Sequence, residues 1–396
     1  MLSLLASYIM LYATYSALIA VFLPLQVEAI DPGRKVANLA LVTSLSAAAT
    51  VLVQPVIGLF SDRTVSRLGR RAPWMLAGTL AAVLCMAGLA SVTTLAWICI
   101  FWILVQVFLN VANGPMSAIV VDRISAARRG TASGFVGAGF LLGTAGGAVL
   151  AGALASTPKY GYFIIGTLLL AVVAGFVRLN PDKTVPLLQQ KKISRRISIR
   201  SWISPFQSPD FVWVFAARFL MILAFHSVTG YMLYILQEHI QVPSGQAPRL
   251  VGSLLAAQLG AALLTILAGG WLSDRLKKRK VLVAVASAIM AGAMTIPLAF
   301  PTVPGMFLFA TVFGFGYGVY TSVDKALMTL VIPDSAGAAA KDLGILNIAT
   351  NIPQMMAPGL AWFLISYMGG YSSLFVVGGA LSLLAAMAIL RVKSVD

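Results

Sequence analysis

Apolar runs of about twenty residues recur along the whole chain and are separated by polar segments. A run of this length can cross the hydrocarbon core of a bilayer as an α-helix. Charged residues make up 10% of the chain, whereas a soluble protein has about 25%. We therefore predict an all-α integral membrane protein. Its twelve predicted transmembrane helices cover residues 3–27, 37–60, 73–93, 96–120, 131–154, 160–178, 210–236, 248–272, 280–300, 305–331, 342–366 and 371–391.

The net charge of +16 lies mostly on one side of the predicted membrane. With the amino terminus placed inside the cell, most of the 28 lysine and arginine residues fall in inner loops. Such an excess of positive charge marks cytoplasmic loops. We therefore predict a multi-pass protein of the cell (inner or plasma) membrane, with both termini in the cytoplasm. The same distribution argues against a nucleic-acid partner, because that role favours one continuous basic stripe.

Two similar basic hairpins follow the second and the eighth predicted helices. The first reads GLFSDRTVSRLGRR over residues 58–71, and the second reads GWLSDRLKKRK over residues 270–280. Their repetition, about half a chain apart, indicates a tandem duplication, and repeated halves around a central pathway are typical of secondary transporters. We predict two six-helix bundles, 1–178 and 210–396, joined by a basic cytoplasmic linker, 179–209.

The paired hairpins resemble the signature loop of the major facilitator superfamily. In the first hairpin, Arg67, Gly69, Arg70 and Arg71 precede Pro73. This pattern is similar to the R-x-G-R-R loop of sucrose transporters and their bacterial relatives, which are neighbours of the glycoside–pentoside–hexuronide cation symporters. The resemblance implies a twelve-helix fold of two bundles and the transport of a sugar.

Two later segments resemble the same branch. Arg218-Phe219-Leu220 opens the seventh helix, and Val323-Asp324-Lys325 lies in the tenth. Lys325 departs from the pattern, because related chains more often have an uncharged residue there. The second helix lacks the paired carboxylates that bind sodium in melibiose-type carriers, so the resemblance favours a proton over sodium as the coupling ion.

Charged residues at the inner ends of the helices are expected to act in gating. In the superfamily, the hairpin carboxylate faces the partially positive amino-terminal end of another helix. This contact ties the two halves together and must break when the cavity opens inward. The alternative is that these charges of the inner loops only fix the topology. The gating candidates are Asp62, Arg63, Arg67, Gly69, Arg70, Arg71, Asp122, Arg123, Asp274, Arg275 and Asp342.

Four ionisable residues fall inside predicted membrane helices: Arg218, His226, Asp324 and Lys325. A charge at mid-helix costs about 3 kcal/mol on insertion scales, so it normally has a partner or a wet cavity. The seventh and tenth helices line the central cavity in the superfamily, and we therefore expect an ion pair between Arg218 and Asp324. Lys325 projects about 100° away from Asp324 and needs its own partner or water.

The coupling hypothesis assigns the transported proton to Asp324. This carboxylate would take a proton from outside, loosen its hold on Arg218 or Lys325, and release the proton when substrate leaves. His226 could relay the proton. The alternative is a permanent structural ion pair in an uncoupled carrier or an exporter.

Substrate contact requires hydrogen-bonding groups and aromatic rings on cavity-facing helices. Asn347, Asn351 and Gln354 share one face of the eleventh helix through their spacing. Amides and phenols without many buried acids suit a neutral polyhydroxylated molecule, although such amides also bond between helices. The substrate-binding candidates are Tyr12, Tyr15, Gln54, Gln106, Asn110, Asn113, Tyr231, Gln258, Asn347, Asn351 and Gln354.

These observations favour a proton-coupled symporter of a neutral sugar, a glycoside or disaccharide, that works by alternating access as a monomer in the lipid bilayer. An exporter of drugs, lipids or metabolites is the main alternative, and it would depend more on the apolar residues Met221, Phe225, Phe313 and Phe315. An enzyme is not expected, because the sequence lacks a recognisable nucleophile–base pair. We also predict no cofactor and no metal site.

Overall fold

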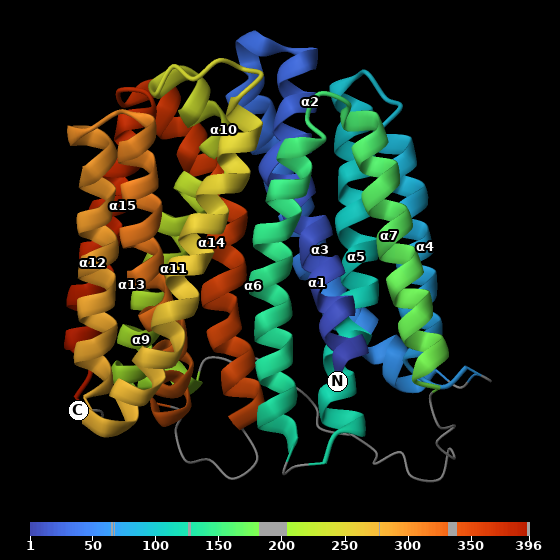
Figure 1. The fold of residues 1–396 in the computed structure, drawn as a ribbon. Coiled ribbons are helices and arrows are strands. Elements are labelled where there is room, and N and C mark those ends of the chain that lie inside the picture. Colours follow the sequence, from blue (N-terminus) through green and yellow to red (C-terminus); the bar gives the residue numbers. More distant parts are fainter. Residues whose placement is uncertain are drawn as a thin grey trace. The chain divides into compact units, whose positions relative to one another are not determined.

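The computed structural model describes residues 1–64, 66, 68–125, 128–181, 204–276, 278–331 and 339–393. Within these residues all regular structure is helical, which confirms the predicted all-α membrane fold (Figure 1). The chain divides into two compact units. Unit 1 comprises Met1–Lys192 with Ser244–Ser253, and unit 2 comprises Ile193–Pro243 with Leu254–Asp396. Most of the predicted linker, residues 182–203, lies outside the described residues.

Unit 1 is built from long helices. The first predicted helix is interrupted by a π-helical turn at Leu18–Phe22, which separates α1 (Leu2–Ala17) from α2 (Leu23–Ile30). A 3-10 turn at Pro32–Arg34 then leads into the second long helix. The remaining helices are α3 (Lys35–Arg63), α4 (Ala72–Leu89), α5 (Leu95–Arg123), α6 (Arg129–Ala153) and α7 (Pro158–Leu179).

Unit 2 repeats this plan with a different break. A 3-10 turn at Ser204–Gln207 precedes its first long helix. The predicted seventh helix breaks after Thr229, and the chain continues as the short helix Met232–Tyr234 and a π-helical turn, Ile235–His239. The helices are α9 (Pro209–Thr229), α10 (Met232–Tyr234), α11 (Ala247–Leu276), α12 (Arg279–Ala299), α13 (Val303–Val331), α14 (Ala339–Tyr367) and α15 (Tyr371–Leu390).

Eleven helices in the described part of the chain are long and apolar enough to cross a membrane. The exception among the twelve predicted spans is α14, which forms a 29-residue helix but contains amide residues and two prolines, Pro353 and Pro358, that lower its hydropathy. Several helices also extend beyond their predicted ends. Asp122 and Arg123, expected in a loop, are the last residues of α5, because a helix can continue past the apolar segment into the polar interface.

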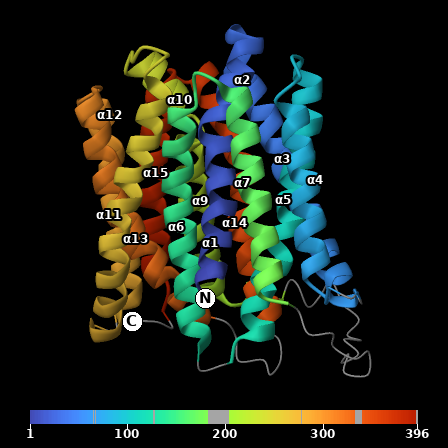
Figure 2. The ribbon, with the colours of Figure 1, turned by 45° about the vertical axis from the view of Figure 1, so that its right-hand side comes forward.

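Helices α1 and α6 approach each other closely, and they lie side by side in both views (Figures 1 and 2). A Cβ atom added to Gly139, Gly143 or Gly147 would come within 2.6, 2.4 and 2.2 Å of an atom of α1. Larger side chains therefore do not fit on this face of α6. Small residues allow membrane helices to pack at such short distances, and this packing fixes the position of the tyrosines on α1.

Candidate functional site

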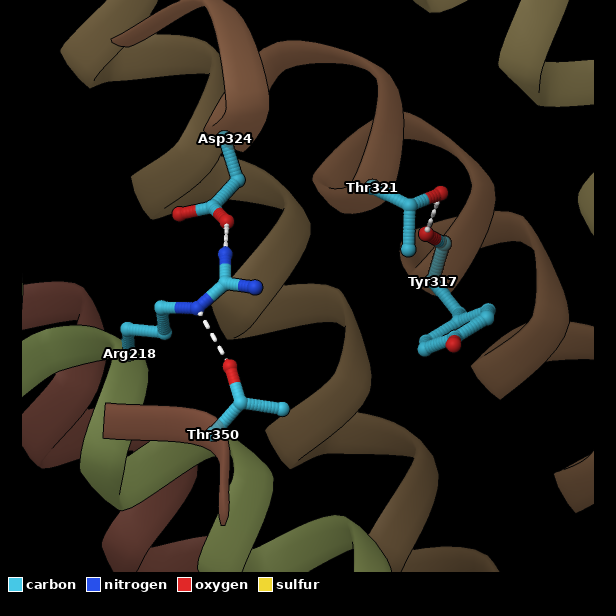
Figure 3. Close-up of polar contacts among 5 residues, drawn as sticks. All are labelled: Arg218, Tyr317, Thr321, Asp324 and Thr350. Carbon is cyan, nitrogen blue, oxygen red and sulfur yellow. Dashed lines mark hydrogen bonds and ion pairs between the residues drawn. The ribbon is translucent and has the colours of Figure 1, made fainter. Parts of the chain in front are cut away.

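Unit 2 contains a buried polar cluster that joins three helices, α9, α13 and α14 (Figure 3). Arg218 of α9 donates a hydrogen bond from Nη1 to Oδ2 of Asp324 on α13, and the two groups form an ion pair. The Nε atom of Arg218 donates to Oγ1 of Thr350 on α14 at 2.9 Å. One guanidinium group therefore holds a carboxylate and a hydroxyl from two different helices.

The ion pair is well shielded. The side chains of Arg218 and Asp324 are 13% and 5% exposed. Arg218 lies near the middle of the 21-residue α9, and Asp324 lies two turns before α13 ends. Among the side chains that the structure describes, Asp324 is the only buried carboxylate. A buried pair of this kind is strongly destabilised when one partner is removed, because the other charge is left uncompensated.

Two tyrosines of α13 lie near this pair, and sequence reasoning missed both of them together with Thr350. Tyr317 lies within electrostatic range of Arg218, and Tyr320 within electrostatic range of Arg218 and Asp324, although its buried hydroxyl has no hydrogen-bond partner among the described residues. Their spacing from Asp324 along the helix places them on one side of α13. That spacing, and the position of Thr350 beside the amide face of α14, could have identified them.

An aromatic cluster adjoins the buried pair in unit 2. The Phe225 ring stacks on Tyr317, with centroids 5.1 Å apart and planes 14° apart, and on Phe313 at 5.7 Å. The His226 ring meets Phe225 edge-on at 5.0 Å. No hydrogen bond joins the His226 ring to any described residue. The side chain of Lys325 lies outside those that the structure describes.

Unit 1 brings three of the predicted amide residues together. The Nε2 atom of Gln54 on α3 donates to Oδ1 of Asn110 on α5 at 3.0 Å. The Nδ2 atom of Asn110 donates in turn to the backbone oxygen of Gln106 at 2.8 Å. Gln106 is buried, whereas Gln54 is exposed. Asn113 lies one turn further along α5 and is half-buried.

The tyrosines of α1 form a stack in unit 1. The rings of Tyr8, Tyr12 and Tyr15 follow one another with centroids 6.1 Å apart. Tyr12 also meets Phe140 of α6 edge-on at 4.8 Å. The hydroxyls of Tyr8 and Tyr15 are buried without a hydrogen-bond partner among the described residues. Tyr8 therefore belongs to the same group as Tyr12 and Tyr15.

The other predicted substrate residues lie apart from these clusters. Tyr231 is 2% exposed, and its hydroxyl donates to the backbone oxygen of Pro358 at 3.1 Å, a contact that links the end of α9 to α14. Gln258 is buried in α11. Asn351 and Gln354 are half-buried on α14, and the side chain of Asn347 lies outside the described ones.

The first hairpin has an internal structure that the sequence did not reveal. The buried Arg71 side chain donates from Nη1 to Oγ of Ser61 at 2.9 Å. Trp74 donates from Nε1 to Oγ1 of Thr64 at 2.6 Å. Gly69 has a φ of 89°, a left-handed conformation that favours glycine. The hairpin is thus held by hydrogen bonds as well as by its charge.

The remaining gating candidates are only partly described. Arg123 donates to the backbone oxygen of Asn180 at 2.9 Å, and Asn180 donates to Oγ of Ser3 at 3.1 Å, so the ends of α5, α7 and α1 are tied together. Arg70 is half-buried, and Arg275 is exposed at the end of α11. The side chains outside the described ones are Asp62, Arg63, Arg67, Asp122, Asp274 and Asp342.

Comparison with known proteins identifies relatives of the whole architecture. The family model described as "Major Facilitator Superfamily" matches residues 4–339 and 234–395. The multi-drug resistance efflux pump PmrA of Streptococcus pneumoniae is 23% identical over 332 residues, which cover 80% of this chain and 77% of that pump. The MFS transporter asaE of Aspergillus flavus is 24% identical over 193 residues, which cover 46% of this chain and 42% of that protein.

Two kinds of solved structure share the fold. The nucleoside transporter NupG aligns with a TM-score of 0.75 and 13% identity, covering 99% of this chain and 98% of NupG. A bacterial homolog of the human lysosomal transporter Spinster, in an inward-facing and unoccupied conformation, aligns with a TM-score of 0.71 and 15% identity, covering 99% of this chain and 97% of the homolog. Identities this low establish the fold alone.

Proposed function

The chain belongs to the major facilitator superfamily and is a secondary transporter, and we propose that it couples the import of a neutral sugar to the entry of protons. The proposed sugar is a glycoside or a disaccharide. The observation that carries this proposal is the buried cluster of Arg218, Asp324 and Thr350. It places one carboxylate, already held by a cation, within membrane-spanning helices.

Protonation of Asp324 would change what this cluster holds together. A neutral carboxyl group no longer compensates the charge of Arg218, so the contact between α9 and α13 weakens while the bond to Thr350 remains. An uncompensated buried charge is costly, and the protein can lower that cost by a rearrangement that admits water or substrate. Proton binding from outside and proton release inside would therefore bias the transporter toward opposite conformations.

The polar groups of unit 1 support a neutral polyhydroxylated substrate. Gln54 and Asn110 offer amides, and Tyr8 and Tyr15 offer hydroxyls that lack protein partners among the described residues. A carrier of organic cations would be expected to bury more than one carboxylate near its substrate. The resemblance of the hairpin to the sucrose-transporter branch points to the same class of substrate.

Export is the second candidate function, and one observation favours it. Phe225, Phe313 and Tyr317 form a stacked aromatic cluster beside the ion pair, which would suit a flat apolar compound. The similarity to an efflux pump is consistent with this reading. In an exporter, the same ion pair would exchange a proton for the outgoing compound. An uncoupled carrier would keep the pair permanently closed.

The topology completes the proposal. The distribution of positive charge supports a place in the cell membrane with both termini in the cytoplasm, and in this proposal the protein works as a monomer. The two predicted bundles, residues 1–178 and 210–396, would rock about a midplane site, with the linker at 179–209 on the cytoplasmic side. The charged hairpins at 58–71 and 270–280 would act as gates on that side.

An electrical measurement on reconstituted protein tests the coupling. Proteoliposomes on a solid-supported membrane receive sucrose, maltose, trehalose, melibiose or glucose in sodium-free buffer at several pH values. We expect a transient inward current with at least one sugar, larger at lower external pH and absent in Asp324→Asn. Thr321→Val is the matched control, because the Thr321 hydroxyl bonds to the backbone of its own helix at 2.9 Å.

The opposite result has a defined meaning. Folded and correctly inserted protein that gives no current with any sugar would contradict proton–sugar symport. Proton-driven uptake of ethidium into inverted membrane vesicles, lost in the same Asp324→Asn variant, would then establish the exporter.

A further inference from the structure

The amide pair of unit 1 has a fixed orientation, and we propose that Gln54 uses it to recognise a vicinal diol of the transported molecule. In this proposal Asn110 is a positioning residue that acts through Gln54. The inference rests on the proposed function, because it assigns a chemical class of substrate to the same transport pathway. It adds that two adjacent hydroxyls are required on the substrate.

The orientation follows from a chain of hydrogen bonds. The backbone oxygen of Gln106 can only accept, so the group of Asn110 that contacts it at 2.8 Å is the amide nitrogen. The oxygen of Asn110 therefore faces Gln54. An oxygen at that place requires a donor, and Gln54 must turn its own nitrogen toward Asn110, at 3.0 Å. The backbone oxygen of Gln106 thus determines the orientation of both side-chain amides, Asn110 and Gln54.

This arrangement leaves defined groups for a ligand. The bond to Asn110 is the one side-chain hydrogen bond that Gln54 makes within the described part of the chain. It uses one of the two N–H donors of Gln54, so the second N–H and the carbonyl oxygen remain. In Asn110, by contrast, one N–H already donates to Gln106 and the side-chain oxygen already accepts from Gln54. Gln54 therefore retains one donor and one acceptor for a ligand.

The surroundings indicate that these groups meet water or a ligand. Asn110 lies near the middle of the 29-residue α5, and Gln54 is exposed on the 29-residue α3. An amide left without partners in hydrocarbon costs several kcal/mol. An exposed glutamine at this depth is consistent with a wet pathway and would be unfavourable against acyl chains.

A vicinal diol matches this pair of groups. One hydroxyl can donate to the carbonyl oxygen of Gln54 while its neighbour accepts from the remaining N–H. A carboxylate offers no donor for the carbonyl oxygen, and an ammonium group offers no acceptor for the N–H. The geometry therefore points to neutral polyols, and the loss of either hydroxyl leaves one polar group of Gln54 unsatisfied.

The decisive experiment compares diols with their deoxy counterparts. Binding is measured as the thermal stabilisation of the purified protein by sucrose, maltose, trehalose, methyl glucoside and its 2-, 3- and 4-deoxy derivatives, and by uridine and 2′-deoxyuridine. Uptake of the same compounds is measured in proteoliposomes. For the compound that binds, we expect removal of one hydroxyl of the recognised diol to weaken binding by about tenfold.

Variants assign the effect to the amide pair. Gln54→Leu is expected to weaken binding of the diol by about tenfold and to abolish the preference over the deoxy compound. Asn110→Leu should reduce that preference without removing the amide of Gln54. The exchange variant Gln54→Asn/Asn110→Gln keeps both amides and should restore part of the preference. Thr43→Val serves as the control on α3, since its hydroxyl bonds to the backbone of its own helix at 2.6 Å.

The outcomes separate this inference from the proposed function. Equal binding of a diol and its deoxy forms, or an unchanged preference in Gln54→Leu, overturns the diol site even if sugar is transported with protons. Preferential binding of uridine without transport of any sugar supports the diol site and contradicts sugar symport. Absence of binding by every diol overturns both.

Discussion

The two polar clusters of this transporter differ in charge, burial and chemical capacity. In unit 2, Arg218 and Asp324 form a charged pair with little exposure. In unit 1, Gln54 and Asn110 form a neutral pair, and Gln54 is exposed. Only the first contains an ionisable carboxylate. In the function that we propose, unit 2 therefore responds to protons, and unit 1 recognises the hydroxyl groups of the substrate.

The strongest test of this division replaces the carboxylate. In Asp324→Asn, sugar should no longer accumulate above its external concentration, because no proton can be carried with it. Exchange of labelled for unlabelled sugar across the membrane should continue, since it requires no net proton movement. Parallel accumulation and counterflow assays in proteoliposomes check this. Loss of exchange together with accumulation would show that Asp324 serves binding rather than coupling.

Replacement of Arg218, the cation of the pair, should have its main effect on the stability of the fold. Arg218→Gln leaves Asp324 buried without its cation, and we expect a loss of about 3–5 kcal/mol in the free energy of unfolding. The double variant Arg218→Gln/Asp324→Asn should recover much of this loss without recovering accumulation. Thermal unfolding in detergent measures the first effect. A double variant no more stable than the single one would contradict a direct electrostatic pair.

Truncation of the amide should have a smaller effect that does not depend on pH. Gln54→Leu is expected to raise the half-saturating sugar concentration about tenfold by the same factor at each pH. The wild-type dependence on external pH should persist, because the proton site is intact. Uptake kinetics over a pH series provide the measurement. A changed pH profile would mean that the two clusters are not separate in function.

The mildest change concerns the hydroxyl that supports the arginine. Thr350→Val removes the acceptor for Nε of Arg218 while the pair with Asp324 remains. Because the ion pair remains, loss of this hydrogen bond should slow transport by about threefold, at the low end of the effect of one hydrogen bond, and leave coupling intact. Thr350→Ser is the conservative control, and it should restore the rate. Wild-type transport rates in Thr350→Val would show that the Thr350 hydroxyl is not required for transport.

Much of the fold could be predicted from local sequence alone. An apolar run of about twenty residues is a property of neighbouring residues, and in lipid it has to satisfy its own backbone as a helix. The helix ends were less accurate, since Asp122 and Arg123 continue α5. The break in the predicted seventh helix was also missed, because a π-helical turn such as Ile235–His239 does not change the hydrophobic pattern.

The candidate site could be predicted only in part. Intramembrane charges are rare enough that Arg218 and Asp324 stood out in the sequence. Thr350, Tyr317 and Tyr320 did not, because hydroxyl side chains are common in such helices and often bond to their own backbone. The bond between Arg71 and Ser61 was missed for a different reason, since arginine in a basic loop is expected to be exposed.

The sequence by itself determined the class of protein, its helices and the short list of polar residues that membrane helices must accommodate. Only the tertiary structure decided how those residues pair. Gln54 and Asn110 are 56 residues apart, and Arg218 and Asp324 are 106 apart. Their contacts depend on how each helix is rotated about its axis and on how closely the helices pack. The close packing of the α6 glycines against α1 is an example. Rotation and distance are properties of pairs of helices, so the pattern within one helix does not contain them.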